Sequence, residues 1–224
     1  MSTVYVHLGH YGSGKTELSL NVALDAAAQG QRVALVDLDI VNPFFRSGEQ
    51  GELLCQAGVE LIAPLFVGTT VDIPALPAKV NAVFSNAYDT VVLDVGGDPA
   101  GATALGRYHK ELQSAHAWVR CVVNPRRPLS ATVADIVTLA RDMEQRGRVR
   151  IDALINNANL LAETTAQIVA DGAQLVAQAA AQLGVAVEFT MTPRRLAQEV
   201  SALLGTPVLP IGIHTRPDWM DTSV

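Results

Sequence analysis

Short apolar runs alternate with longer amphipathic segments along the whole chain. Residues 4–8 and 32–37 are mostly apolar and rich in valine, which is typical of strands buried on both faces. Between them, residues 15–29 repeat apolar side chains at helical spacing, and Gly30 follows as a stop signal. Strand and helix patterns in alternation predict a parallel sheet with helices on both faces.

The same alternation continues to residue 204. Apolar runs at 59–64, 89–97, 117–124, 151–157 and 185–190 predict strands, and residues 42–57 predict a loop and a short helix. Helical periodicity covers 74–86, 101–113, 128–145, 164–183 and about 194–204. No internal repeat or linker divides the chain. The sequence therefore predicts one three-layer α/β domain over residues 1–224, with a mostly parallel, doubly wound sheet and an irregular tail at about 205–224.

Composition narrows the class of protein. The 224 residues are 49% hydrophobic and 17% charged, which is enough apolar material for a core, and the net charge is −6. An acidic chain gains nothing from phosphate-backbone attraction, so we expect no nucleic-acid partner. No apolar run approaches the ~18 residues of a membrane span. Cys55 and Cys121 lack metal-ligand spacing, and the first residues do not resemble a secretion signal. We therefore expect a cytoplasmic protein that does not bind membranes.

The stretch "GHYGSGKT" carries the clearest chemical signal. It follows a predicted strand, opens a predicted helix and fits G-x-x-x-x-G-K-[ST], the P-loop pattern. Backbone N–H groups of such a loop and the helix N-terminus bind phosphate oxygens. Lys15 is expected to reach the β- and γ-phosphates, and the Thr16 hydroxyl to ligate Mg²⁺. The expected nucleotide-binding residues here are Gly9, Gly12, Ser13, Gly14, Lys15 and Thr16.

Acidic residues follow two other predicted strands. In "VLDVGG", Asp94 ends an apolar run as a Walker-B-type carboxylate does, and residues 94–97 read as D-x-x-G. The N–H of Gly97 is then placed to meet the γ-phosphate. Asp37 and Asp39 end the second predicted strand. A single strand-end aspartate can be an ordinary cap or turn residue, but two such strand ends after a P-loop favour a metal–phosphate site.

Together these motifs resemble the MinD/ParA/CobQ/CobB superfamily of P-loop ATPases, which includes the nitrogenase iron protein. The resemblance extends over roughly residues 4–196 and implies ATP and Mg²⁺ as cofactors. It implies that Asp39 orients the attacking water and that Asp94 supports Mg²⁺ through water. Lys15 and Asp39 are then the expected catalytic residues, and Thr16, Asp39 and Asp94 the expected metal-binding residues.

The resemblance also indicates how the base is read. Asn156 resembles the family asparagine that reads adenine, and the Thr192-Pro193 loop resembles the segment that closes over the other side of the base. Asp98, after Gly97, is similar to the iron-protein residue that relays nucleotide state. Residues 156–159 lack the N-K-x-D pattern of guanine-reading proteins, which favours ATP. An asparagine after a strand is also an ordinary turn residue.

Three departures limit the resemblance. The partitioning branch has a lysine at position 10 that reaches across a dimer, whereas this chain has His10, and Tyr11 where that branch has glycine. No cysteine pair is present to hold an iron–sulfur cluster between subunits, and the C-terminal tail is not a basic amphipathic helix. A homodimer remains possible, but a ParA-like dimer switch is disfavoured.

Two segments keep alternative interpretations. Residues 42–46, "NPFFR", are either core aromatics or a switch that presents an apolar, cationic patch to a partner. Arg126 and Arg127 either face solvent or contact phosphate or an acidic substrate at the rim of the site.

Three functions follow. The first is a slowly hydrolysing Mg-ATP switch acting on an unidentified client protein, in enzyme maturation or assembly. The second is an ATP-dependent ligase of the cobalamin- or biotin-synthesis type, which activates a small carboxylate substrate. The third is a spatial-organising ATPase of the ParA/MinD type.

Overall fold

The sheet is the framework of the computed structural model, which describes residues 2–39, 48–63, 75–85 and 87–215. Within these ranges eight strands form one sheet in the order β3-β2-β4-β1-β5-β6-β7-β8, and every neighbouring pair is parallel. The strands are β1 (Thr3–Leu8), β2 (Val33–Asp37), β3 (Val59–Ile62), β4 (Thr90–Asp94), β5 (Trp118–Val123), β6 (Ala153–Asn156), β7 (Ala186–Pro193) and β8 (Val208–Ile211). The predicted α/β fold with a parallel sheet is confirmed.

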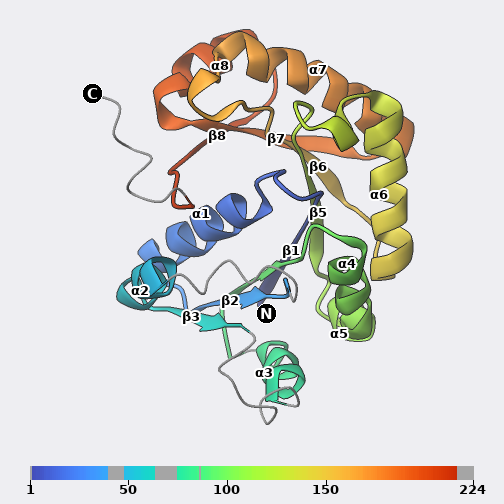
Figure 1. Cartoon of the computed structure of the whole chain (residues 1–224). Coiled ribbons are helices and arrows are strands. Elements are labelled where there is room, and N and C mark those ends of the chain that lie inside the picture. The colour runs from blue at the N-terminus through green and yellow to red at the C-terminus, as the bar shows by residue number, and fades with distance from the viewer. Residues whose placement is uncertain (1, 40–47, 64–74, 86, 216–224) are drawn as a thin grey trace.

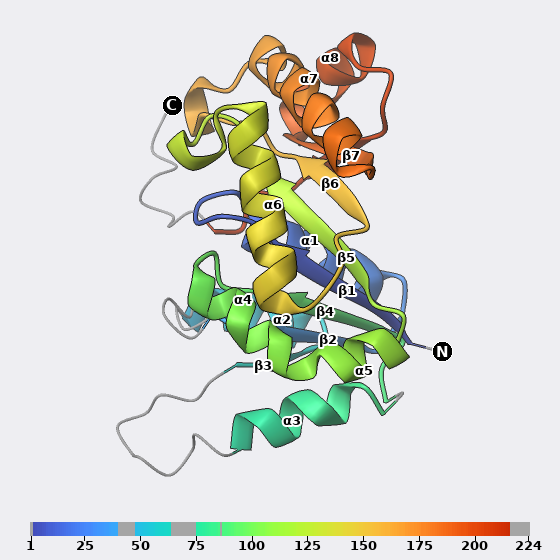
Figure 2. The ribbon, with the colours of Figure 1, turned by 90° about the vertical axis from the view of Figure 1, so that its right-hand side faces the viewer.

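Helices cover both faces of this sheet. They are α1 (Lys15–Ala28), α2 (Gly48–Gln56), α3 (Ala75–Val83), α4 (Pro99–Leu105), α5 (His109–Ser114), α6 (Val133–Gly147), α7 (Ala166–Leu183) and α8 (Ala197–Leu203). Helices α1 and α2 lie on one face and α3 to α8 on the other (Figures 1 and 2). The twisted sheet curves around α1, so this helix contacts both edge strands, β3 and β8 (Figure 1). In the described part of the chain, no helix combines the length and the apolar character needed to cross a membrane.

The burial of the strands follows from their sequence. Every residue of β2 and of β4 is buried, as their continuous apolar runs predict for strands covered on both faces. Alternate residues of β1 pack on opposite sides, and Val4, Val6 and Leu8 join the large core cluster beneath α4, α5 and α6. The carboxyl ends of the strands, where ligands bind in open α/β sheets, therefore meet around the first turn of α1.

Two expectations about the elements are wrong. The helix expected at 101–113 is divided into α4, a 3₁₀ turn (Gly106–Tyr108) and α5. Gly106 packs closely on α6 there, and a Cβ on it would lie 2.7 Å from the Arg146 carbonyl oxygen. The tail expected to be irregular contains β8, which pairs with β7. This edge strand has only four residues and includes Pro210, which an edge position tolerates.

Candidate functional site

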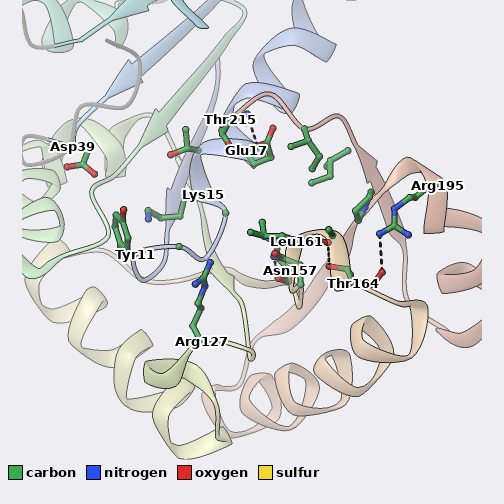
Figure 3. Close-up of a pocket in the computed structure, with 18 residues that line it drawn as sticks. Tyr11, Lys15, Glu17, Asp39, Arg127, Asn157, Leu161, Thr164, Arg195 and Thr215 are labelled. Carbon is green, nitrogen blue, oxygen red and sulfur yellow. Dashed lines mark hydrogen bonds between the residues drawn. The ribbon is translucent and has the colours of Figure 1, made fainter. Parts of the chain in front are cut away.

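A cavity of about 450 Å³ opens where the strand ends meet the first turn of α1 (Figure 3). Its walls come from the P-loop and from the segments that follow β2, β5, β6, β7 and β8. The lining residues are Tyr11, Gly12, Gly14, Lys15, Thr16, Glu17, Asp39, Arg127, Asn157, Asn159, Leu161, Ala162, Thr164, Pro193, Arg195, Ile211, Ile213 and Thr215. Segments far apart in the sequence thus line one space.

The P-loop needs glycine for its close approaches. Gly9, Gly12 and Gly14 all have positive φ, a conformation that side chains with a Cβ rarely adopt. A Cβ on Gly9 would collide with the Val122 carbonyl oxygen, and one on Gly14 would collide with the Asn157 side chain. The backbone N–H of Ser13 donates to the His10 carbonyl oxygen at 3.0 Å and closes the turn. Ser13 is itself buried beneath the loop and does not line the cavity.

Charged groups are concentrated at the start of α1. Lys15 is only 7% exposed, and its Nζ donates to the His10 carbonyl oxygen at 3.3 Å. The Thr16 hydroxyl donates to Oδ2 of Asp94 at 2.6 Å. Burial lowers the pKa of Lys15, against the opposing effect of Asp94, and burial raises the pKa of Asp94 to about 6, against that of Lys15. Each of these groups favours a ligand that brings the opposite charge into the site.

The residues at this point fit a magnesium ion. Thr16 and Asp94 present hard oxygen ligands, and the buried Oδ1 of Asp94 has no hydrogen-bond partner among the described residues. Mg²⁺ typically takes one or two carboxylates and completes its shell with phosphate and water. Among the described residues, no group of three or more His, Cys, Asp or Glu side chains is placed to hold a metal ion.

Asp39 lies at the same end of the cavity. It follows β2, lines the cavity, and its backbone N–H donates to Oδ1 of Asp37 at 2.8 Å. Its carboxylate rests against Gly96, since a Cβ there would lie 3.3 Å from Asp39 Cγ. The structure therefore brings together Lys15, Thr16, Asp39 and Asp94, as expected. The neighbouring residues 42–46 lie outside the described part of the chain.

The D-x-x-G turn is pressed against the P-loop. A Cβ on Gly97 would lie 2.5 Å from the backbone nitrogen of Tyr11, so no larger residue fits there without moving the loop. Asp98 then caps α4 by accepting a hydrogen bond from Gly101 N at 2.7 Å, and Gly101 packs directly on Gly96. This turn joins the P-loop to α4 through backbone contacts.

The two asparagines after β6 have different positions relative to the cavity. Asn156 does not line the cavity: it is fully buried, and its Nδ2 donates to the Val169 carbonyl oxygen at 3.2 Å. The next residue, Asn157, lines the cavity and donates from Nδ2 to the Ser13 carbonyl oxygen at 2.7 Å. The alternation of β6 explains this, because Ile155 packs with Leu18 of α1, so the following asparagine points away from that side. Side chains alternate along a strand, so residues 155 and 157 lie on the α1 side, and this alternation could have indicated from the sequence that Asn157 faces the cavity.

The segment after β8 forms a wall that sequence reasoning missed. The Glu17 carboxylate accepts hydrogen bonds from His214 N at 2.6 Å, Thr215 N at 3.2 Å and Thr215 Oγ1 at 2.6 Å. The Asn21 side chain bonds both backbone groups of Gly212, at 2.8 and 2.9 Å. Residues 212–215, which we call the C-terminal clasp, are thereby fastened to α1. No local pattern signals contacts between residues so distant in sequence.

The clasp and the β6–α7 loop both contribute walls to the cavity. Ile211 and Ile213 belong to one wall, and Leu161 and Ala162 to the other. Of the expected Thr192-Pro193 loop, Pro193 lines the cavity, whereas Thr192 is fully buried.

Arg126 and Arg127 have different environments. Arg127 lines the cavity beside the P-loop (Figure 3). Arg126 instead turns toward α7, where its Nη2 lies 3.4 Å from the Ile168 carbonyl oxygen and 3.5 Å from Oδ2 of Asp171.

Comparison with known proteins agrees with this architecture. The sequence profile of the CobQ/CobB/MinD/ParA nucleotide binding domain (CbiA) matches residues 9–221. No curated protein matches the chain in sequence.

Solved structures with a similar fold include signal-recognition-particle receptors. Chloroplast FtsY from Physcomitrella patens has a TM-score of 0.58 at 20% identity, covering 85% of this chain and 58% of that one. Cell division protein FtsY from Thermotoga maritima has a TM-score of 0.58 at 17% identity, covering 86% and 62%. FtsY from Elizabethkingia anophelis in complex with GDP has a TM-score of 0.52 at 17% identity, covering 85% and 57%. The chain thus spans about three fifths of each FtsY structure, and similarity at these identities shows the fold alone.

Proposed function

Because the chain belongs to the CobQ/CobB/MinD/ParA family of nucleotide-binding P-loop ATPases, we propose that it binds Mg-ATP, hydrolyses it slowly and acts as a nucleotide switch on a client protein. The observation that carries this proposal is the meeting of Lys15, Asp39 and the Thr16–Asp94 pair at one end of a single cavity. We place this activity in the cytoplasm.

Each group at this end has a distinct role. The Lys15 ammonium binds the β- and γ-phosphates, and the backbone N–H groups of the P-loop bind the remaining oxygens of the triphosphate. Thr16, Asp94 and Asp39 are the residues that would hold Mg²⁺, which neutralises charge on the phosphates when bound. Asp39 orients a water molecule toward the γ-phosphate, since it faces the cavity from the strand beside β4.

ATP is the proposed nucleotide. The apolar side chains of Leu161 and Ile213 offer packing surfaces for a base, and the amides of Asn157 and Asn159 are polar groups of the same lining. The segment 156–159 lacks the N-K-x-D pattern that reads guanine. Asn157 takes the base-reading role that the sequence had assigned to Asn156.

The switch is proposed to run through α4. Gly97 touches the P-loop backbone, and the next residue, Asp98, caps α4. A displacement of the turn on binding or loss of the γ-phosphate would therefore reach α4 directly. The exposed surface of this helix is the proposed contact for the client.

One observation favours the ligase as a second candidate. Arg127 is a cavity-lining cation that could hold a small carboxylate beside the γ-phosphate, whereas Arg126 is engaged with Asp171. The ParA/MinD-type alternative has less support. The ring of His10 makes its hydrogen bond to the P-loop itself, at the Tyr11 carbonyl oxygen.

Nucleotide binding and hydrolysis by three variants test the proposal. We expect Lys15→Ala to abolish ATP binding, and Asp39→Ala to retain it while slowing hydrolysis at least about tenfold. Lys79→Ala, at an exposed position of α3, is the control for loss of a lysine. Hydrolysis by Asp39→Ala at the wild-type rate would contradict the assignment of the water-orienting group, and equal dissociation constants for ATP and GTP would contradict the nucleotide assignment.

A second experiment separates switch from ligase. ADP release that depends on an added small carboxylate would favour the ligase. Capture of a protein only by Asp39→Ala loaded with Mg-ATP, and not by the nucleotide-free form, would favour the switch.

A further inference from the structure

The Arg127 side chain is held flat against the P-loop. A Cβ on Gly12 would lie 3.2 Å from Arg127 Nε, 3.3 Å from Cζ and 3.4 Å from Nη2. The guanidinium therefore lies over the glycine loop itself, at the phosphate end of the cavity (Figure 3). Gly12 leaves the space that this contact requires.

The backbone that carries Arg127 is fixed by the turn after β5. Arg127 N donates to the carbonyl oxygen of Asn124 at 3.0 Å, and the Ser130 hydroxyl donates to the same oxygen at 2.7 Å. The Asn124 side chain in turn accepts from Arg126 N at 3.0 Å and Asn159 N at 3.2 Å. The turn is thereby joined to the loop after β6, and the arginine has a rigid support.

The guanidinium lacks a protein partner in the described part of the chain. The four ion pairs there involve other arginines, namely Arg32, Arg120, Arg126 and Arg146. Arginines on a surface usually face solvent, but this one leans over a loop whose amides bind phosphate. A planar guanidinium donates hydrogen bonds in a geometry that matches phosphate oxygens.

We propose that Arg127 binds the phosphate chain of the nucleotide in cis and stabilises the charge that develops during hydrolysis. This inference rests on the proposed ATPase function. In that reaction water forms a bond to the γ-phosphorus, the bond from this phosphorus to the β-phosphate oxygen breaks, and ADP leaves with the electron pair. The proton of the water passes to the released phosphate. Arg127 donates to the phosphate oxygens on which negative charge gathers.

This assignment explains why position 10 can be a histidine. In the partitioning ATPases that the sequence resembles, a lysine at this position brings a cation from a second subunit. Here His10 is held to the Tyr11 carbonyl oxygen, and Arg127 of the same chain already covers the loop. A cation supplied in cis makes hydrolysis independent of dimer formation.

Adjacent arginines give a matched test. We expect Arg127→Ala to lower kcat at least about thirtyfold and to weaken ATP binding only about threefold to tenfold, because the contact strengthens as charge develops. Arg127→Lys should recover part of the rate, since it restores the charge but not the bidentate geometry. Arg126→Ala, which removes the same charge one residue away, should stay within about twofold of wild type. Equal thermal unfolding midpoints for the two alanine variants would show that folding is not the cause.

Mixing two inactive variants separates action in cis from action in trans. Arg127→Ala has an intact Lys15, and Lys15→Ala has an intact Arg127, so an arginine acting across a dimer would restore activity in the mixture. We expect no restoration. Restored activity, or a wild-type kcat in Arg127→Ala, would overturn the proposal while leaving the ATPase function standing. A wild-type protein that neither binds nor hydrolyses ATP would overturn both.

Discussion

The C-terminal clasp gives the sharpest prediction about nucleoside binding. Glu17 is 6% exposed, and its two carboxylate oxygens accept hydrogen bonds from two backbone N–H groups and one hydroxyl of residues 214–215. Glu17→Gln keeps the size of the side chain but leaves one acceptor oxygen. The new amide then places N–H groups opposite the N–H of His214 or Thr215.

The expected size of the effect follows from these contacts. A hydrogen bond to a charged group contributes about 1.5–3 kcal/mol. The substitution removes at least one such bond, so it should weaken attachment of the clasp by about 2 kcal/mol. The bonds of Asn21 to Gly212 remain, and the clasp stays tethered. If the base needs this wall in place, about 2 kcal/mol corresponds to at most a roughly thirtyfold higher Kd for ATP.

Calorimetry with two ligands tests this reasoning. ATP contacts both ends of the cavity, whereas inorganic tripolyphosphate contacts only the P-loop end. We expect Glu17→Gln to weaken ATP binding much more than tripolyphosphate binding, which reaches the clasp only indirectly. Asp25→Asn, the same charge change at an exposed position of α1, is the control. The reasoning would be refuted if Glu17→Gln bound ATP as tightly as the control, or if it lost affinity equally for both ligands.

Three further predictions concern the other walls. Gly97→Ala should lower ATP affinity in calorimetry and the free energy of unfolding in urea by about 1–3 kcal/mol, because its Cβ would press on the P-loop backbone. Gly205→Ala, whose Cβ would meet nothing within 4 Å, is the control and should show neither change. Asn157→Ala should weaken ATP binding and reduce the preference for ATP over GTP, measured as the ratio of their dissociation constants. Asn156→Ala should reduce thermal stability and leave that ratio unchanged. The opposite pattern would restore Asn156 as the base-reading residue. Burial raises the pKa of Asp94 to about 6, so the unliganded protein should lose stability relative to Asp94→Asn as pH rises from about 4 to about 7, by roughly 3 kcal/mol in urea unfolding; a difference independent of pH would contradict that pKa.

The elements that the sequence predicted correctly are those with strong periodicity or a long apolar run. β2 and β4 are such runs, and α6 and α7 have helical spacing with threonine N-caps. β8 was missed because four residues containing a proline give no periodic signal, and its place is set by pairing with β7. The break between α4 and α5 depends on the approach of Gly106 to α6, which only the tertiary structure reveals.

The same distinction holds within the cavity. The proximity of Lys15, Thr16, Asp39 and Asp94 could be predicted because the P-loop is contiguous and because carboxylates at the ends of parallel strands must meet at one edge. The base end is assembled from segments after β6, β7 and β8, and its critical contact joins Glu17 to Thr215. The sequence pointed to Asn156, whereas Asn157 lines the cavity, because a motif gives the location of a loop but not the direction of each side chain. Strand alternation decides that direction.

The two ends of the cavity are connected by adjacent residues of α1. Thr16 donates to Asp94 at the proposed metal site, and Glu17 holds the clasp at the base end. Successive helical residues point about 100° apart, so two neighbours can face two different walls. The P-loop precedes this turn directly, and any movement of the turn on phosphate binding must therefore carry Thr16 and Glu17 together. We accordingly expect tripolyphosphate to slow amide hydrogen exchange at His214 and Thr215, although it does not reach them. In Glu17→Gln this protection should disappear even when the P-loop is saturated. Unchanged protection in the variant would show that the phosphate and base ends respond independently.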